Sequence, residues 1–157
     1  MTPYLFVHRS RFDVPAADLF AWHERPEALA DLLPRSPFVR VESSDGSLRD
    51  GSRVVLRFGV GPVAFRWVAL HHGFEPGVRF RDDQVAGPFA FWRHTHTVRP
   101  DGADASILED QVEFALPGGR LGRFAAPLVA RALRGAFEQR HAVTRASLAR
   151  TPRGRAA

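Results

Sequence analysis

Two histidines and a tryptophan alternate with other residues in GPFAFWRHTHTV, residues 87–98, where Trp92, His94 and His96 are spaced two apart. Side chains two residues apart in a β-strand lie on the same face. The two imidazole rings would therefore lie side by side, next to an indole ring. Imidazole can bind a metal ion, exchange a proton near neutral pH or hydrogen-bond a bound molecule. The spacing predicts a polar site on one face of this strand.

Carboxylates occur with the same alternation in other segments. In ASILEDQVEFAL, residues 105–116, Glu109 lies on a polar face, whereas Asp110 shares its face with apolar residues. Two further sets share a face by the same rule: Phe80, Asp82 and Gln84, and Phe65, Trp67, Ala69 and His71. A lone buried carboxylate is costly, whereas a paired one is tolerated. The histidines are the natural partners for these acids.

This argument decides which face of residues 87–98 we expect to point inward. If the Trp92 face is inside, the two histidines meet Asp110 across a hairpin pair. Phe89 and Phe91 would then pack outside, under a loop or against a second subunit of a homodimer. We therefore predict that Trp92, His94 and His96 face the interior.

Four interpretations of these polar residues remain open. A metal ion needs three or more ligands, of which His94 and His96 supply two and Asp82, Asp110 or His71 a third. A His–Asp pair can act as a general acid and base. The same groups can brace the sheet by hydrogen-bonding one another, or bind the head group of a ligand. An HxH pattern without a third residue fixed by the sequence is weak evidence for a metal, so we expect no metal or cofactor and assign no catalytic residue.

The elements that must position these residues follow from the periodicity. Residues 4–12 alternate as a strand, and residues 16–33 hold two short helices, the second beginning at Pro26. From Phe38 to residue 116 a period of two continues through six segments separated by turn dipeptides such as Asp45-Gly46 and Asp101-Gly102. Apolar residues then recur at helical spacing: Leu121, Phe124, Leu128, Leu133, Phe137, Val143 and Leu148.

This order predicts an α+β fold of the helix-grip type. A seven-stranded twisted antiparallel sheet would wrap on one long C-terminal helix, with the two short helices between the first two strands, because only the long helix is large enough to cover one face of the sheet. We expect residues 1–150 to form a single domain and residues 151–157 a disordered tail.

Composition narrows the class of protein further. The chain has no cysteine, which removes disulfides and thiolate metal sites. Its N-terminal apolar run is too short for a signal peptide and no segment approaches the roughly 20 apolar residues of a membrane span, so we expect a cytoplasmic protein without stable membrane insertion. Nine arginines and one acid, Glu138, follow Pro117. These arginines lack interleaved exposed aromatic residues, which argues against nucleic acid and leaves an anionic partner open.

A resemblance to a known superfamily rests on particular residues. They are Phe12 with Pro15, Ala21-Trp22-His23, Leu33-Pro34, Trp67, Phe80 with Asp82 and Gln84, Gly87-Pro88-Phe89, Trp92 with His94 and His96, Asp110 and Arg140. With the order of elements, they resemble the START/Bet v 1-like superfamily, also called SRPBCC or polyketide cyclase-like, and more narrowly its small bacterial ligand-binding branch. The resemblance covers nearly the whole chain. It implies a hydrophobic cavity between sheet and helix that takes lipids, sterols, polyketides or other apolar molecules.

We therefore expect the chain to bind an apolar or amphipathic small molecule as a carrier or sensor. One alternative is an acid–base enzyme of the cyclase or dehydratase type, using His94 or His96 with Asp110 or Asp82. Another is an interaction module for an epimerase-like partner, because the resembling branch is similar to a domain found beside epimerase domains. Arg140 is expected to pair with an acid of a strand. The expected ligand-binding residues are Trp67, His71, Phe80, Asp82, Gln84, Trp92, His94, His96, Asp110, Phe114, Phe124 and Leu128.

Overall fold

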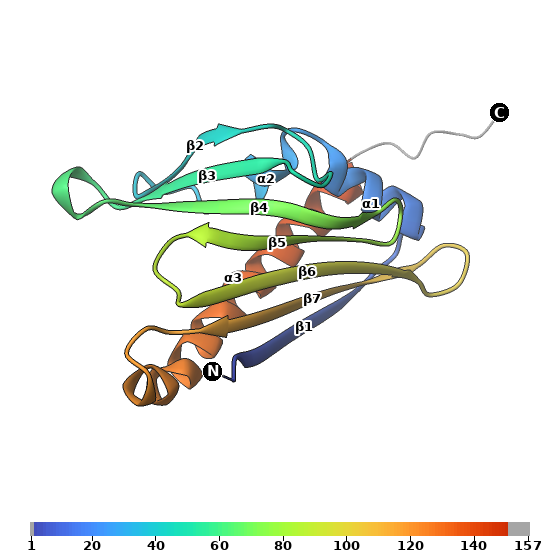
Figure 1. Cartoon of the computed structure of the whole chain (residues 1–157). Helices are drawn as coiled ribbons and strands as arrows, with labels where there is room; N and C mark the ends of the chain where they lie inside the picture. Colours follow the sequence, from blue (N-terminus) through green and yellow to red (C-terminus); the bar gives the residue numbers. More distant parts are fainter. Residues whose placement is uncertain (1, 151–157) are drawn as a thin grey trace.

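A computed structural model describes residues 2–150 of the chain (Figure 1). The expected order of strand, two short helices, six strands and long helix is confirmed. The elements are β1 (Tyr4–Phe12), α1 (Ala16–Glu24), α2 (Ala28–Leu32), β2 (Val39–Ser44), β3 (Arg53–Phe58), the 3-10 turn η1 (Gly61–Val63), β4 (Phe65–Glu75), β5 (Arg79–Ala86), β6 (Phe91–Pro100), β7 (Ser106–Ala115) and α3 (Arg120–Arg150). The expected disordered tail, residues 151–157, lies outside the described residues.

The seven strands form one antiparallel sheet in the order β1-β7-β6-β5-β4-β3-β2. Strands β2 to β7 follow one another as neighbours, and β1 pairs along its length with β7. Glycine residues allow the tight turns between neighbouring strands. Gly59, which follows β3, has φ of +86°, and a Cβ atom there would lie 3.0 Å from the carbonyl oxygen of Val63. Only glycine adopts this conformation without strain.

The helices cover one face and one end of the sheet. In Figure 1, α3 runs diagonally behind the strands, and α1 and α2 lie near its C-terminal end. Pro15 immediately precedes α1, and Asp18 stands in the first turn, where a negative charge stabilises the helix. No helix within residues 2–150 is long and apolar enough to cross a membrane.

The buried apolar side chains form two separate groups. The first apolar cluster consists of Phe6, Trp92, Val112, Phe114, Ala126 and Phe137. The second apolar cluster consists of Phe12, Leu19, Phe20, Phe80, Val98 and Leu108. Along β6 the inward side chains run from Trp92 in the first cluster to Val98 in the second, with His94 and His96 between them. The polar residues therefore occupy a gap between two apolar cores.

The helical pattern was wrong for the first turns of α3. Phe124 is 83% exposed and Leu128 is 72% exposed, whereas Phe137 is buried. An α-helix turns by about 100° per residue, so positions nine apart, such as 124 and 133 or 128 and 137, lie on opposite sides. The inward stripe instead contains Ala126, Ala130, Leu133, Phe137, His141, Thr144 and Leu148.

Candidate functional site

The polar residues meet because the strand register places them side by side. On β5 and β6, Asp82 is the partner of His94. On β6 and β7, His96 is the partner of Asp110, and on β7 and β1 Asp110 is the partner of His8. Two rows of side chains thus cross the inner face of the sheet: one contains Asp82 and His94, and the other contains His96, Asp110 and His8. The prediction that the histidine face of β6 points inward is confirmed by the burial of Trp92, His94 and His96.

Asp110 lies at the centre of this polar group, with its side chain only 3% exposed. His94 Nε2 lies 2.9 Å from Asp110 Oδ1 and donates to it. His96 Nδ1 lies 2.6 Å from the same oxygen, although off the direction of a hydrogen bond. His141 of α3 donates from Nε2 to Asp110 Oδ2. Three histidines from two elements therefore surround one buried carboxylate.

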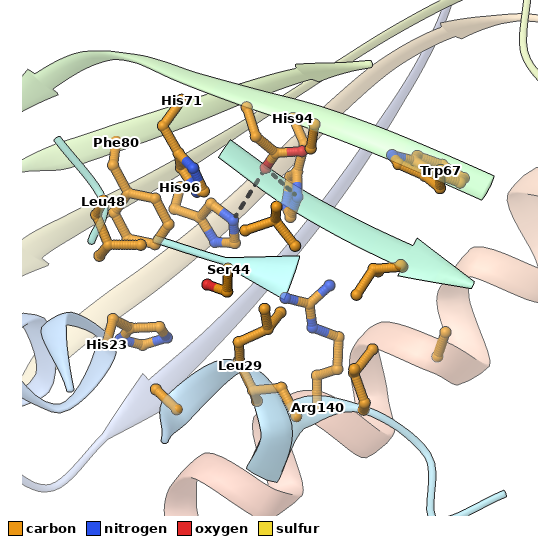
Figure 2. A pocket seen from close by; sticks show the side chains of 18 of the residues that line it. His23, Leu29, Ser44, Leu48, Trp67, His71, Phe80, His94, His96 and Arg140 are labelled. Atoms are coloured by element: carbon orange, nitrogen blue, oxygen red, sulfur yellow. Dashed lines mark ion pairs between the residues drawn. The ribbon is translucent and has the colours of Figure 1, made fainter. Parts of the chain in front are cut away.

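Asp82 lies on the other side of the same two rings. Its Oδ2 atom is 3.4 Å from His94 Nδ1 and 3.8 Å from His96 Nε2, and its side chain is 17% exposed. Each imidazole of β6 thus lies between two carboxylates. Figure 2 shows His94 and His96 next to each other on one wall, with their ion pairs drawn as dashed lines.

These contacts shift the pKa values of the group. Burial alone would raise the pKa of Asp110, but the His96 ring and the hydrogen bonds from His141 and His94 outweigh it and hold that pKa well below its usual value. Burial is likewise outweighed at Asp82, whose pKa is lowered by His94 and His96. Burial would lower the pKa of His94, but Asp110 and Asp82 raise it. Both carboxylates are therefore ionised, and His94 favours its protonated form.

A cavity of about 400 Å³ opens onto this group. Its polar wall includes Asp82, His94, His96 and His71. The apolar walls come from α2, the loop before β3, strands β3 to β6 and α3: Leu29, Leu32, Leu33, Leu48, Val54, Leu56, Phe58, Trp67, Ala69, Phe80, Trp92, Leu133 and Phe137. The Trp92 side chain lines this cavity, and its indole N–H is buried without a hydrogen-bond partner among residues 2–150.

Two further histidines line the cavity in neutral form. His23 of α1 lies with Nδ1 2.8 Å from the Leu19 carbonyl oxygen. Burial, with a smaller contribution from His96, lowers the pKa of His23 to about 3. His71 lies with Nδ1 3.3 Å from the Ser52 carbonyl oxygen, and burial lowers its pKa as well. Besides Asp82 and His94, three charged residues line the cavity: Glu24, Arg25, which pairs with Asp31, and Arg140.

The expected pairing of Arg140 with a strand acid is not found within residues 2–150. Arg140 lines the cavity, and its guanidinium packs 5.2 Å from the centre of the Phe137 ring. No carboxylate of residues 2–150 lies within 4.0 Å of it. Figure 2 shows Arg140 extending from α3 toward the space that His94 and His96 face. A cation therefore stands at the cavity with no anion beside it.

The structure brings most, but not all, of the expected site residues to the cavity. Trp67, His71, Phe80, Asp82, Trp92, His94 and His96 line it. Asp110 lies beneath the histidines, and Phe114 is fully buried in the first apolar cluster. Phe124 and Leu128 lie on the exposed side of α3, away from it, which corrects their expected place.

Gln84 and Phe89 have a different role from the one expected. The Gln84 amide donates to the Phe89 carbonyl oxygen at 2.9 Å, which fixes the turn at Gly87-Pro88. Phe89 packs against the first apolar cluster, with its ring 4.8 Å from that of Trp92. The expectation that Phe89 packs outside was wrong, because β6 begins only at Phe91 and the alternation of faces does not extend to the turn.

Sequence reasoning missed His141 and the wall formed by α2. His141 is spaced four residues from Phe137 and three from Thr144, so a regular helical stripe drawn through Phe137 would have found it. Leu29, Leu33 and Leu48 reach the cavity only because segments far apart in the chain meet there. No local pattern marks them.

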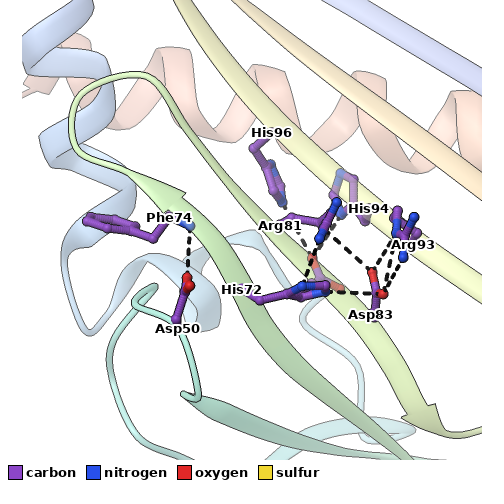
Figure 3. Close-up of polar contacts among 9 residues, drawn as sticks. Asp50, His72, Phe74, Arg81, Asp83, Arg93, His94 and His96 are labelled. Carbon is purple, nitrogen blue, oxygen red and sulfur yellow. Dashed lines mark hydrogen bonds and ion pairs between the residues drawn. The ribbon is translucent and has the colours of Figure 1, made fainter.

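The opposite face of the same strands carries a separate polar group (Figure 3). His72 Nε2 lies 3.1 Å from Asp83 Oδ2, and Arg93 donates to Asp83 at 3.0 Å. Arg81 contacts His72 Nδ1 at 2.8 Å. His72 and Asp83 are sequence neighbours of the cavity residues His71 and Asp82 but point away from the cavity, so they provide matched controls.

Comparison with known proteins identifies a family and a fold. Residues 39–148 match the family model described as "Domain of unknown function (DUF8410)". No curated protein matches the chain. Among solved structures, a START superfamily protein from Mycobacterium smegmatis aligns with a TM-score of 0.68 at 11% identity, over 92% of this chain and 97% of that one.

Two solved enzymes align with this chain, the second over less than a third of its own length. Norcoclaurine synthase from Thalictrum flavum, in complex with dopamine and hydroxybenzaldehyde, aligns with a TM-score of 0.71 at 16% identity, over 96% of this chain and 90% of that one. The nucleoside-diphosphate sugar epimerase from Corynebacterium glutamicum aligns with a TM-score of 0.72 at 23% identity, over 92% of this chain but 29% of that one. At these identities the likeness establishes the fold, which is that of the START/Bet v 1-like superfamily, as the sequence resemblance implied.

Proposed function

This chain belongs to the family described as "Domain of unknown function (DUF8410)", and from its own cavity we propose that it binds an amphipathic small molecule. The observation that carries the proposal is the cavity of about 400 Å³, which lies between the sheet, α2 and α3. Sites for small molecules are typically concave, mostly apolar and equipped with a few convergent polar groups. This cavity has that composition.

The apolar walls are suited to the body of the ligand. Leucines from α2 face Trp67 and Phe80 of the sheet across the space, so an aliphatic or aromatic body contacts side chains on both sides. Burying apolar surface stabilises a complex by roughly 25 cal/mol per Å² before the costs of association are counted.

Arg140 is suited to an anionic head group. Its guanidinium lies at the cavity without a carboxylate partner within residues 2–150, beside the ring of Phe137. Arginine binds carboxylates and phosphates through two parallel hydrogen bonds, and such charge-assisted bonds are stronger than neutral ones. We therefore favour a ligand with an apolar body and a carboxylate or similar anion, such as a fatty acid or an acidic polyketide.

The proposal is tested by filling the cavity. Ala69→Trp places an indole in the space that the ligand would occupy, whereas Val85→Trp adds the same group on the exposed part of β5. We expect native mass spectrometry of freshly purified protein to show a non-covalent adduct, and dodecanoate to bind both the natural protein and Val85→Trp. Ala69→Trp should lose the adduct and dodecanoate binding. Equal binding by both variants, or none by the natural protein, would refute the proposal.

A second candidate function is acid–base catalysis, favoured by one specific observation. His96 lines the cavity beside the ionised carboxylates of Asp82 and Asp110, and an imidazole positioned by carboxylates can act as a general base. The fold is shared with norcoclaurine synthase, an enzyme, which supports this candidate only at the level of fold. Such a site would remove a proton next to the carbonyl of a bound ketone.

The catalytic candidate is tested by proton exchange. We expect an active site of this kind to accelerate deuterium exchange at the α-carbon of benzylacetone in D₂O, followed by NMR. His96→Ala should abolish the acceleration, and His72→Ala should leave it intact. If the natural protein exchanges the α-protons no faster than buffer, acid–base catalysis of this type is excluded.

A further inference from the structure

The geometry points to a divalent transition-metal site formed by Asp82, His94 and His96 at the cavity wall. One carboxylate oxygen and two ring nitrogens from these residues all lie within 4.8 Å of one another. All three side chains are buried or nearly so, and all three line the cavity. The inference goes beyond ligand binding, because it assigns an inorganic cofactor to the same wall.

The separations between Asp82 and the two histidines are close to those of ligands that share one metal ion. Asp82 Oδ2 lies 3.4 Å from His94 Nδ1 and 3.8 Å from His96 Nε2. Zinc–nitrogen and zinc–oxygen bonds of about 2.0–2.2 Å in a tetrahedron place neighbouring ligand atoms about 3.3–3.6 Å apart. Small side-chain movements therefore suffice to close the three ligands around an ion.

The nitrogens that would not bind the metal already have a carboxylate beside them. His94 Nε2 and His96 Nδ1 lie 2.9 Å and 2.6 Å from the same oxygen of Asp110. Metal-bound histidines almost always direct their other ring N–H at such an outer acceptor, which sets the orientation of the ring and the nitrogen that is free. Asp110 is held in turn by His141 through its second oxygen. The remaining nitrogens face Asp82.

Charge and access also favour a divalent ion. Asp82 and Asp110 place two negative charges in a buried region, and a divalent cation compensates both when the histidines are neutral ligands. Three protein ligands leave at least one coordination position open, and here that position faces the cavity. Two histidines and one carboxylate suit zinc or ferrous iron rather than magnesium or calcium.

The experiment is a titration of the metal-free protein with Zn²⁺ and Co²⁺. After treatment with a chelator and dialysis, calorimetry should show one site per chain, and bound Co²⁺ should give the visible absorption of a four- or five-coordinate ion. We expect Asp82→Asn and His96→Gln each to weaken Zn²⁺ binding 100-fold or more. Asp110→Asn, which keeps all three ligands, should weaken it 10- to 100-fold.

Matched controls come from the outer face of the same strands. Asp83→Asn and His72→Gln alter the neighbours of Asp82 and His71 without touching the cavity, so they should bind Zn²⁺ as tightly as the natural protein. A metal-free circular dichroism spectrum shows which variants are folded. Equal affinity in folded Asp82→Asn and Asp83→Asn, or no saturable binding by the natural protein, overturns the inference.

A second measurement does not depend on any variant. In nitrogen-15 spectra of the natural protein, Zn²⁺ should shift Nδ1 of His94 and Nε2 of His96 and leave His72 unchanged. Shifts confined to other histidines would overturn the inference. Because no organic ligand is used, these results are independent of whether the cavity binds an amphipathic molecule.

Discussion

His141 donates from Nε2 to Oδ2 of Asp110, which makes this the polar contact that joins α3 to the centre of β7. The contact lies between the two apolar clusters, with Phe137 of the first cluster one helical turn before it and Leu148 beside the second. Asp110 therefore connects the docking of the helix with the orientation of both β6 histidines. The stability of the fold and the geometry of the site depend on the same carboxylate.

Replacing Asp110 with asparagine should destabilise the protein by about 3 kcal/mol, because removal of one partner from a buried ionic group leaves the others uncompensated. Glu109→Gln changes the adjacent residue, whose ion pair with Arg9 lies at the surface, and should cost less than about 1 kcal/mol. Urea denaturation followed by circular dichroism measures both. Similar losses in the two variants would mean that the buried network contributes nothing beyond a surface pair.

His23 should make the protein less stable at mildly acidic pH. Its pKa is about 3 in the folded chain and about 6.5 in an unfolded one, so below pH 6.5 only the unfolded state gains the proton. Between pH 7 and pH 5 this effect removes about 2 kcal/mol from the free energy of unfolding. In His23→Asn, whose amide can still donate to the Leu19 carbonyl, that part of the pH dependence should disappear. Denaturation curves of the natural protein and of His23→Asn give the free energy of unfolding of each at every pH. If the difference between the two free energies does not change with pH, the prediction is contradicted.

Two glycines of α3 should respond oppositely to alanine. A Cβ atom at Gly122 would lie 2.5 Å from the Pro117 carbonyl oxygen, so Gly122→Ala should destabilise the protein by about 1–3 kcal/mol. At Gly135, which is exposed in the middle of the helix, nothing lies within 4 Å of that position. Gly135→Ala should therefore stabilise by about 0.5–1 kcal/mol. The measurement is the midpoint temperature of thermal unfolding of each variant relative to the natural protein. A change of this temperature in the same direction for both variants would be inconsistent with the packing of α3 described above.

Removal of the Arg140 charge should change the selectivity of the cavity. Arg140→Gln should weaken the binding of dodecanoate by about 10- to 100-fold, the range expected for one charge-assisted hydrogen bond of about 1.5–3 kcal/mol. Dodecanol, which lacks the anion, should bind the natural protein and the variant alike. Arg131→Gln, on the exposed side of α3, serves as the control for net charge. Equal loss for acid and alcohol would show that Arg140 acts through packing on Phe137 instead.

The sequence by itself determined the order of elements and, within each strand, which residues share a face. The period of two in residues 105–116 separates Asp110 from Glu109, and the same period places Trp92, His94 and His96 together, because the backbone of a strand directs alternate side chains to opposite sides. The turn dipeptides predict where the hairpins lie, because the backbone conformation of a tight turn depends on the residues in the turn itself. These features require only neighbouring residues, which is why they could be predicted.

Tertiary structure decided everything that depends on how distant segments meet. The register of β5 against β6 places Asp82, and not Gln84, opposite His94, and the rotation of α3 about its axis turns His141 and Arg140 inward while Phe124 and Leu128 face outward. The wall formed by α2 depends on the same docking. A helix with apolar residues on two sides does not specify from its own sequence which side is buried, because burial is set by the surface against which it packs.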